Sequence, residues 1–328
     1  MAQDSSHTVL VRCAHSRILR KCFEVYLSGS SRIWNHSPAS MRRHPLGQAY
    51  GRHLNAIVHL QAERAQNYST YFLRNRAELE LMRRLLDQKA YGSTLDITVL
   101  ACSKGAEVYS IVWTIRSARP DLKLRMHAVD VSEEVLEFAE RGVYSRTQPD
   151  VLKAPNLAGI KNRNRDGETW KFWIFERMTD EEVKAMFEVE GDQATVRTWL
   201  KAGITWLRWD AGDPALIDVL GPQDIVVANR FLCHMRPPAA LKCLRNVARL
   251  VAPGGHLFVS GVDLEVRIQV AREMGWKPVT DLIREIHEGD PSLTSGWPFG
   301  WWGLEPFSDD RPDWKIRYAS VFQIGEAS

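Results

Sequence analysis

The chain reads ITVLACSKGAE from Ile97 to Glu107, and this stretch decides the fold. Its first five residues are apolar or β-branched, as in a buried strand, and a break that contains Gly105 follows. From Glu107 to Arg119 the pattern is helical, and it stops before Pro120, because proline disfavours helix in the residue before it. The stretch therefore predicts a strand, a loop and a helix, the unit from which parallel sheets are built.

The same alternation continues along the chain. A second strand is predicted at 124–129, and the helix predicted at Ser132–Gly142 has a capping serine, early acidic residues and a terminal glycine. A helix at 239–250 is expected to end at a turn formed by Pro253–Gly255. The other strands are expected at 204–209, 224–228, 255–259 and, at an edge of the sheet, 316–324. We therefore predict an α/β protein with a doubly wound, mostly parallel sheet.

The segments around this core differ from it in character. Residues 1–90, rich in helix formers from 42 to 88, are predicted to form an N-terminal helical segment. Residues 91–328 are predicted to form the sheet domain with an aromatic C-terminal extension. The polar stretch 148–192 predicts an excursion beside the core, with an exposed loop at 161–167.

Charge is unevenly distributed along the chain. The net charge is +3, whereas residues 1–68 alone contain nine basic and three acidic residues. This segment is either a surface for an acidic partner or anionic substrate, or a solvated helical face. No nucleic-acid-binding motif accompanies the charge, so nucleic acid is not an expected partner.

The cellular setting is predicted from what the sequence contains. There are five cysteines without a CxxC pair, the start of the chain is polar, and no apolar run approaches the ~20 residues needed to cross a bilayer. These features predict a cytoplasmic protein without a membrane partner. The sequence has no HExxH motif and no Cys/His pairing, so no metal is expected.

The loop after the first strand predicts a cofactor. It lies at the carboxyl end of a parallel strand, where doubly wound sheets bind nucleotide-like ligands, but its single glycine does not form the GxGxxG motif for pyrophosphate. Asp130 closes the second strand and suits ribose hydroxyls, and Glu107 suits an ammonium group. Taken singly, Glu107 is also explained by a helix N-terminus and Asp130 by a helix cap. Together they predict S-adenosylmethionine.

Four motifs then resemble the successive signature blocks of CheR-type methyltransferases, which methylate glutamates of chemotaxis receptors. They are Thr70–Arg74 (TYFLR), Ala101–Ser110 (ACSKGAEVYS), Ala128–Ser132 (AVDVS) and Asn229–Met235 (NRFLCHM). The resemblance covers residues 69–261 and implies a class I methyltransferase domain. It also implies that Thr70 and Arg74 reach the cofactor, that Glu107 holds its methionyl amine and that Asp130 holds its ribose.

Other positions depart from the family pattern. Asp210 falls where the family has an asparagine beside the adenine, Asn229 and Arg230 fall on its Arg-Asn pair in swapped order, and His234 replaces its tyrosine near the transferred methyl. The predicted catalytic residues are His234, Arg74 and Arg230. The predicted cofactor-binding residues are Thr70, Arg74, Ala101, Cys102, Ser103, Gly105, Glu107, Asp130, Val131, Asp210, Ala211, Asn229 and Arg230.

Three functions remain open on the sequence. The leading hypothesis is an O-methyltransferase for a small-molecule or saccharide hydroxyl, with His234 as the base or as a structural histidine. The second is a protein-carboxylate methyltransferase, and the third is an inactive cofactor-binding module. Arg74 and Arg230 either steer an anionic acceptor or bind the cofactor carboxylate. The aromatic cluster at 297–307 forms either a wall of the acceptor pocket or a seal over the sheet edge.

Overall fold

The computed structural model describes residues 17–61, 68–152, 170–290, 293, 296–300 and 303–325. Contacts divide the chain into two compact units. The helical unit comprises residues 1–65, 153–170 and 291–307, and the sheet unit comprises residues 66–152, 171–290 and 308–328. Residues 66–90, which the sequence analysis assigned to the N-terminal segment, are thus grouped with the sheet. The loop predicted at 161–167 lies outside the described residues.

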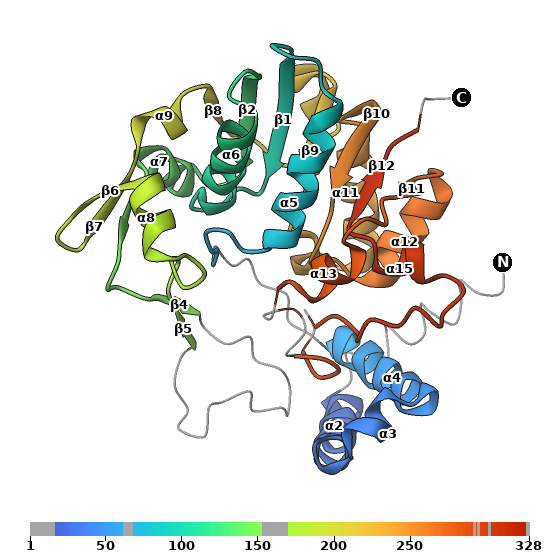
Figure 1. Cartoon of the computed structure of the whole chain (residues 1–328). Coiled ribbons are helices and arrows are strands. Elements are labelled where there is room, and N and C mark those ends of the chain that lie inside the picture. The colour runs from blue at the N-terminus through green and yellow to red at the C-terminus, as the bar shows by residue number, and fades with distance from the viewer. Residues whose placement is uncertain are drawn as a thin grey trace. The chain divides into compact units, whose positions relative to one another are not determined.

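A seven-stranded sheet in the order β11-β12-β10-β9-β1-β2-β8 forms the centre of the sheet unit (Figure 1). The pairs β1–β2, β1–β9, β2–β8 and β9–β10 are parallel, and β12 is antiparallel to both of its neighbours. The predicted doubly wound, mostly parallel sheet is therefore confirmed. Its strands are β1 (Thr94–Leu100), β2 (Lys123–Asp130), β8 (Ile204–Arg208), β9 (Gln223–Val227), β10 (Val251–Phe258), β11 (Lys277–Pro278) and β12 (Val321–Gln323).

Helices cover both faces of this sheet. The strand order advances from β1 to β8 and then reverses at β9. Because parallel crossovers are right-handed, helices after β1 and β2 lie on one face and those after β9 and β10 on the other. The helices of the sheet unit are α5 (Arg76–Leu85), α6 (Ala106–Ala118), α7 (Glu133–Arg141), α8 (Asp180–Met186), α9 (Thr198–Lys201), α10 (Leu216–Leu220), α11 (Pro237–Ala248), α12 (Leu264–Glu273), α13 (Ile283–Glu288) and α15 (Trp314–Tyr318), with short 3-10 turns at Leu86–Gln88 (η1) and Leu232–His234 (η2).

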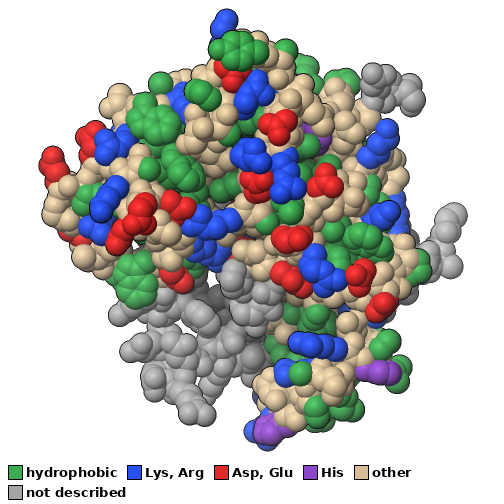
Figure 2. Space-filling model, in the orientation of Figure 1, with side chains coloured by type: hydrophobic (Ala, Val, Ile, Leu, Met, Phe, Trp, Pro, Cys, Tyr) green, Lys and Arg blue, Asp and Glu red, His purple; other side chains and the backbone are tan. Residues whose placement is uncertain are grey.

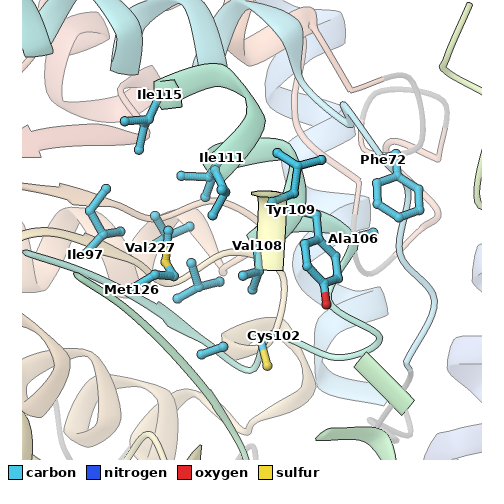
Figure 3. Packing of buried hydrophobic residues seen from close by; sticks show 14 of the residues in the cluster. Phe72, Ile97, Cys102, Ala106, Val108, Tyr109, Ile111, Ile115, Met126 and Val227 are labelled. Atoms are coloured by element: carbon cyan, nitrogen blue, oxygen red, sulfur yellow. The ribbon is translucent and has the colours of Figure 1, made fainter. Parts of the chain in front are cut away.

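The core is packed between β1, its neighbours and α6 (Figure 3). Ile97 and Met126 of the sheet, and Val108 and Ile111 of α6, are at most 1% exposed. Burying each such side chain contributes roughly 1.5–3 kcal/mol. The junction between β1 and α6, which carries the predicted cofactor loop, therefore rests on fully buried apolar side chains.

Helix α7 shows how the local sequence sets its boundaries. Ser132 accepts a hydrogen bond from the backbone N–H of Val135 at the start of the helix (3.4 Å). Gly142 ends it with φ 61°, a left-handed conformation that costs glycine little. Both were predicted from the sequence.

Two predicted boundaries were wrong. Pro253–Gly255 does not end a helix, since α11 already ends at Ala248, but forms an irregularity inside β10. The backbone of Ile324 exchanges hydrogen bonds with Gly254 and Gly255, so sheet pairing extends over the expected turn.

The expected final strand at 316–324 is split. Its first part belongs to α15, and β12 lies between β10 and β11, which leaves β11 as the edge strand. The buried Arg267 donates a hydrogen bond to the backbone oxygen of Arg317 (2.8 Å). This long-range contact stabilises the end of α15 and overrides the alternating pattern.

The predicted excursion at 148–192 contains further strands and α8. β6 (Phe187–Glu190), β7 (Gln193–Val196) and β3 (Val143–Ser145) form a three-stranded antiparallel sheet. The other two short strands are β4 (Asp150–Leu152) and β5 (Trp170–Phe172).

The helical unit contains α2 (Arg17–His36), α3 (Ala39–Arg43) and α4 (Pro45–Gln61). Part of the aromatic cluster packs here, since the rings of Trp34 and Trp297 meet edge to face at 5.3 Å. Trp301 and Trp302 lie outside the described residues. Among the described helices, none is long and apolar enough to cross a lipid bilayer.

Candidate active site

A cavity of about 260 Å³ lies in the sheet unit, where β1, β2, β8 and β9 end. It is lined by Tyr68, Ser69, Thr70, Arg74, Ala101, Cys102, Ser103, Glu107, Asp130, Val131, Trp209, Asp210, Ala211, Asn229, Arg230, Phe231, His234 and Met235. Every predicted site residue except Gly105 lines this cavity. Five lining residues were missed: Tyr68, Ser69, Trp209, Phe231 and Met235. They flank or lie inside the predicted motifs and strands, so position next to a motif was the available signal.

Gly105 shapes the loop without lining the cavity. It precedes α6 with φ 80°, and a Cβ there would lie 3.0 Å from the Cβ of Ala139 and 3.1 Å from the ring of Trp206. Glycine is therefore required by both conformation and space.

The loop before Gly105 is held in an uncommon conformation. Ala101 and Ser103 both have φ 51°, which costs a residue other than glycine roughly 1–2 kcal/mol. The Ser103 N–H donates to Asp130 Oδ2 (2.9 Å), and its hydroxyl donates to the backbone oxygen of Tyr68 (2.7 Å). These bonds offset the cost and fix the loop against β2.

Asp130 is buried at the end of β2 and faces the cavity. Its Oδ1 accepts the Ser132 N–H (3.1 Å), and its Oδ2 accepts the Ser103 N–H. Each carboxylate oxygen has two lone pairs, so each keeps capacity for one ligand hydroxyl.

Three side chains from different elements form a hydrogen-bonded network at the cavity wall. Asn229, just after β9, donates to Glu78 of α5 (2.7 Å) and to Glu107 of α6 (2.8 Å). Its carbonyl oxygen accepts both the N–H (2.9 Å) and the hydroxyl (2.8 Å) of Ser260. One amide thus joins two carboxyl groups, and Glu78 was not among the predicted residues.

Proximity and burial change the acidity of both carboxyl groups. Burial, followed by the neighbouring charge of Glu107, raises the pKa of Glu78 to about 8. Burial also raises the pKa of Glu107, against the opposing effects of the Asn229 hydrogen bond and the Arg74 cation. The pair therefore holds a proton at neutral pH more readily than ordinary glutamates do.

A cluster of arginines lies on the same side of the cavity. Asp290 is 2% exposed and accepts hydrogen bonds from Arg177 (2.8 Å) and Arg230 (2.7 Å), and an Arg74 nitrogen lies 3.8 Å from it. Burial, then the charge of Arg230, lower the pKa of Arg74 to about 10, so it stays a cation at neutral pH. Figure 2 shows basic and acidic side chains interspersed over the visible surface.

Arg230 has a constrained backbone. Its φ is 63°, and its N–H donates to the backbone oxygen of Ser260 (2.9 Å). A Cβ on Gly261 would lie 2.8 Å from the Arg230 Cα. Glycine at 261 is therefore what lets Arg230 take its place in the cavity wall.

The remaining predicted residues lie elsewhere on the wall. Asp210 follows β8, and its Oδ1 accepts the N–H of Gly212 (2.8 Å), which fixes the turn. Ala211 is buried and Val131 is 43% exposed, so they give this part of the wall an apolar surface. His234 is at the end of η2 and also lines the cavity.

The sheet order, the antiparallel β12 and the cavity with acidic residues after β1 and β2 define a class I methyltransferase, whose cofactor is S-adenosylmethionine. Residues 68–169 match the family described as CheR methyltransferase, SAM binding domain. This part of the chain is therefore similar to the S-adenosylmethionine-binding domain of CheR methyltransferases.

Three curated proteins are similar to this chain. An uncharacterized 104.1 kDa protein of Rhodobacter capsulatus, in the hypE 3′ region, is 26% identical over 201 residues, 58% of this chain and 18% of that protein. The "Probable biofilm formation methyltransferase WspC" of Pseudomonas aeruginosa is 24% identical over 224 residues, 67% of this chain and 47% of that protein. The "Probable chemotaxis protein methyltransferase" of Rhizobium etli is 22% identical over 198 residues, 58% of this chain and 65% of that protein. The chain thus spans less than two thirds of each relative.

Proposed function

We propose that this methyltransferase transfers its methyl group to a carboxylate, and that the acceptor is a glutamate side chain of a protein. The observation that carries the proposal is the arginine cluster, because Arg74 and Arg230 both line the cavity and are held by the buried Asp290. Cations fixed beside a reaction site favour an anionic acceptor.

The balance of charge supports an anionic acceptor. At the arginine cluster, Arg74, Arg177 and Arg230 supply three positive charges against Asp290 and Glu107, and the raised pKa of Glu78 favours its neutral form. The other two acidic residues of the cavity wall, Asp130 and Asp210, lie at the end of β2 and after β8, two strands on the other side of β1 from β9 and Arg230. The methionyl part of S-adenosylmethionine is a zwitterion, so it changes this balance little, and its sulfonium adds one more positive charge. A carboxylate acceptor neutralises part of the excess, whereas a neutral hydroxyl does not.

The residues present fit the cofactor. Glu107 faces the cavity and suits the methionyl ammonium, and Asp130 keeps acceptor capacity for the ribose hydroxyls. Asp210, an acceptor beside the apolar Ala211, suits the adenine amine. When bound, S-adenosylmethionine supplies an electrophilic methyl carbon.

The chain then has mainly to position the acceptor. A carboxylate is already anionic at neutral pH, so no protein group needs to remove a proton from it. One guanidinium suffices for the single carboxylate of the cofactor, and the other remains for the acceptor. Orientation of the acceptor oxygen in line with the methyl carbon is then the main contribution of the protein.

A second candidate is the hydroxyl acceptor favoured by the sequence analysis. The observation behind it is that His234 lines the cavity, where an imidazole suits removal of a hydroxyl proton. His234→Phe separates the two candidates, because a carboxylate acceptor does not require the imidazole.

The relatives add support for a protein acceptor. One is described as a probable chemotaxis protein methyltransferase and another as a probable biofilm formation methyltransferase. A proposal of protein glutamate methylation agrees with the first of these descriptions.

The decisive experiment uses S-adenosylmethionine with a tritiated methyl group, the purified full chain and two acceptor pools, proteins and small metabolites. We expect label on protein that alkali releases as volatile methanol, the behaviour of a methyl ester. Alkali-stable label on a small molecule would instead favour the hydroxyl acceptor. Intact cofactor binding with label in neither pool would favour the inactive module.

A further inference from the structure

We propose that Asp290 is a positioning residue for the acceptor carboxylate, because it fixes Arg230 and Arg74 in the cavity wall. This inference rests on the proposed function, and it concerns a residue that does not itself line the cavity.

Asp290 is buried and forms ion pairs with three arginine side chains. Its side chain is 3% exposed, whereas those of Arg74, Arg177 and Arg230 are 13%, 17% and 23% exposed. Oδ1 accepts from Arg177 and Oδ2 accepts from Arg230, with Arg74 near the same oxygen. A single carboxylate thus orders three side chains that otherwise repel one another.

Arg177 is the second partner of Asp290, and it does not line the cavity. Its Nη1 donates to the backbone oxygen of Arg74, and its guanidinium lies 4.5 Å from the ring centre of Tyr71. The Arg74 guanidinium lies 5.2 Å from the same ring. Arg177 and Tyr71 therefore fix Arg74 from behind, and Asp290 connects Arg177 to Arg230.

The backbone around Asp290 is itself held in place. Asn75 accepts the Glu78 N–H at the start of α5 (3.2 Å) and donates to the backbone oxygen of Ile286 in α13 (2.8 Å). A Cβ on Gly289 would lie 2.5 Å from Asn75 Oδ1 and 2.6 Å from the Glu285 backbone oxygen. The residue before Asp290 must therefore be glycine for α13 to approach α5 this closely.

Arg230 lines the cavity and has N–H donors beyond the one that Asp290 accepts. One of its terminal nitrogens is committed to Asp290, and a guanidinium has five N–H donors in a fixed plane. With one edge fixed, the remaining donors point in a defined direction, so an acceptor carboxylate meets an oriented group. Losing that orientation weakens acceptor binding and slows transfer, but it leaves the Asp130 and Asp210 side of the cofactor site intact.

The test compares Asp290→Asn with Asp309→Asn, a matched control that removes an exposed ion pair with Arg284 in the same part of the chain. The probe is capped glutamate, N-acetyl-L-glutamic acid α-amide, titrated into the protein saturated with S-adenosylhomocysteine. We expect Asp290→Asn to weaken probe binding by roughly 30-fold or more, the scale for breaking a buried charge pair. S-adenosylhomocysteine affinity should fall less than probe affinity, because Arg74 lies 3.8 Å from Asp290, is also held against the ring of Tyr71 and remains for the cofactor carboxylate. The control should match the wild type.

A second readout does not depend on the acceptor. Nuclear magnetic resonance of the arginine guanidinium groups reports rotation about the Cζ–Nε bond, which is slow when an ion pair fixes the group. Asp290→Asn should make this rotation fast for Arg230, with the signal assigned by Arg230→Lys. A merely structural role for Asp290 would leave both rotation and probe affinity at the wild-type level in the folded variant, and that result overturns the proposal.

The two proposals fail in different ways. If the wild type binds no glutamate probe, the proposed function fails, and the guanidinium rotation alone decides whether Asp290 positions Arg230. If Asp290→Asn does not fold, Arg177→Met is the second variant, because it removes one ion pair of Asp290 at a residue that does not line the cavity. It should weaken probe binding by roughly tenfold. Unchanged binding in folded Arg177→Met would likewise overturn the proposal.

Discussion

The buried carboxyl pair predicts an unusual dependence of stability on pH, and Glu78→Gln is the perturbation that exposes it. In the folded protein Glu78 keeps its proton up to about pH 8, whereas a glutamate in the unfolded chain loses it near the ordinary value of 4.5. Between these values the folded state binds the extra proton, so stability falls as pH rises. The stability that protonated Glu78 contributes is fully present below about pH 4.5 and is lost above about pH 8.

The magnitude follows from the two pKa values. Their difference, 8 minus 4.5, is 3.5 units, which corresponds to roughly 5 kcal/mol at most, with a slope of about 1.4 kcal/mol per pH unit. Burial of Glu107 acts in the same direction. Glutamine retains the oxygen that accepts from Asn229 and has no charge to bury. We therefore expect the free energy of unfolding of Glu78→Gln to fall less steeply with pH than that of the wild type. Near pH 8.5 it should be higher than the wild-type value by about 1–3 kcal/mol.

Urea unfolding from about pH 5.5 to about pH 8.5 measures this difference, with cofactor absent. Glu80→Gln is the matched control, since Glu80 is on the same helix but its hydrogen bonds with Arg83 and Arg84 lower its pKa to about 2, outside the pH range. Parallel stability curves for wild type and Glu78→Gln would refute the reasoning, because they would show that Glu78 ionises in the fold without cost.

Three further predictions concern the cofactor and the backbone that supports it. Binding of S-adenosylhomocysteine should release more protons as the pH falls below neutrality, because burial raises the pKa of Glu107 and the ligand ammonium favours its ionised form; calorimetry in buffers of different ionisation enthalpy measures the release, and heats that do not depend on the buffer would contradict it. Asp130→Ala should weaken cofactor binding by about 1–3 kcal/mol in a titration, with unchanged affinity as the contrary result. Gly261→Ala should slow methyl transfer and lower stability by about 1–3 kcal/mol, because its Cβ meets Arg230; wild-type melting and turnover would show that the loop adjusts freely.

The sequence predicted those site residues that directly follow a strand. The loop at 101–105, Asp130 and Asn229 all follow predicted strands, and parallel strands bring their carboxyl ends to one edge of the sheet. Knowing the strands was therefore enough to predict that these residues meet. The local caps of α7 were predictable for the same reason, since their signals lie within a few residues.

The rest of the site depends on contacts between distant segments. Glu78 meets Asn229 across 151 residues, and Asp290 meets Arg177 across 113. A glutamate in an amphipathic helix and an aspartate before a proline have no local feature that distinguishes them from surface residues. The split of 316–324 was missed likewise, because the contact with Arg267 that stabilises α15 comes from another helix.

The position of β12 has a consequence for how the protein is made. Among the described strands it comes last in the chain, yet it pairs with β10 on one side and β11 on the other. On the ribosome, β10 and β11 therefore emerge before the strand that joins them, and the edge of β10 stays unpaired until residues 321–323 have been synthesised. Open strand edges promote association between chains, so chains stalled or cleaved before this point should aggregate.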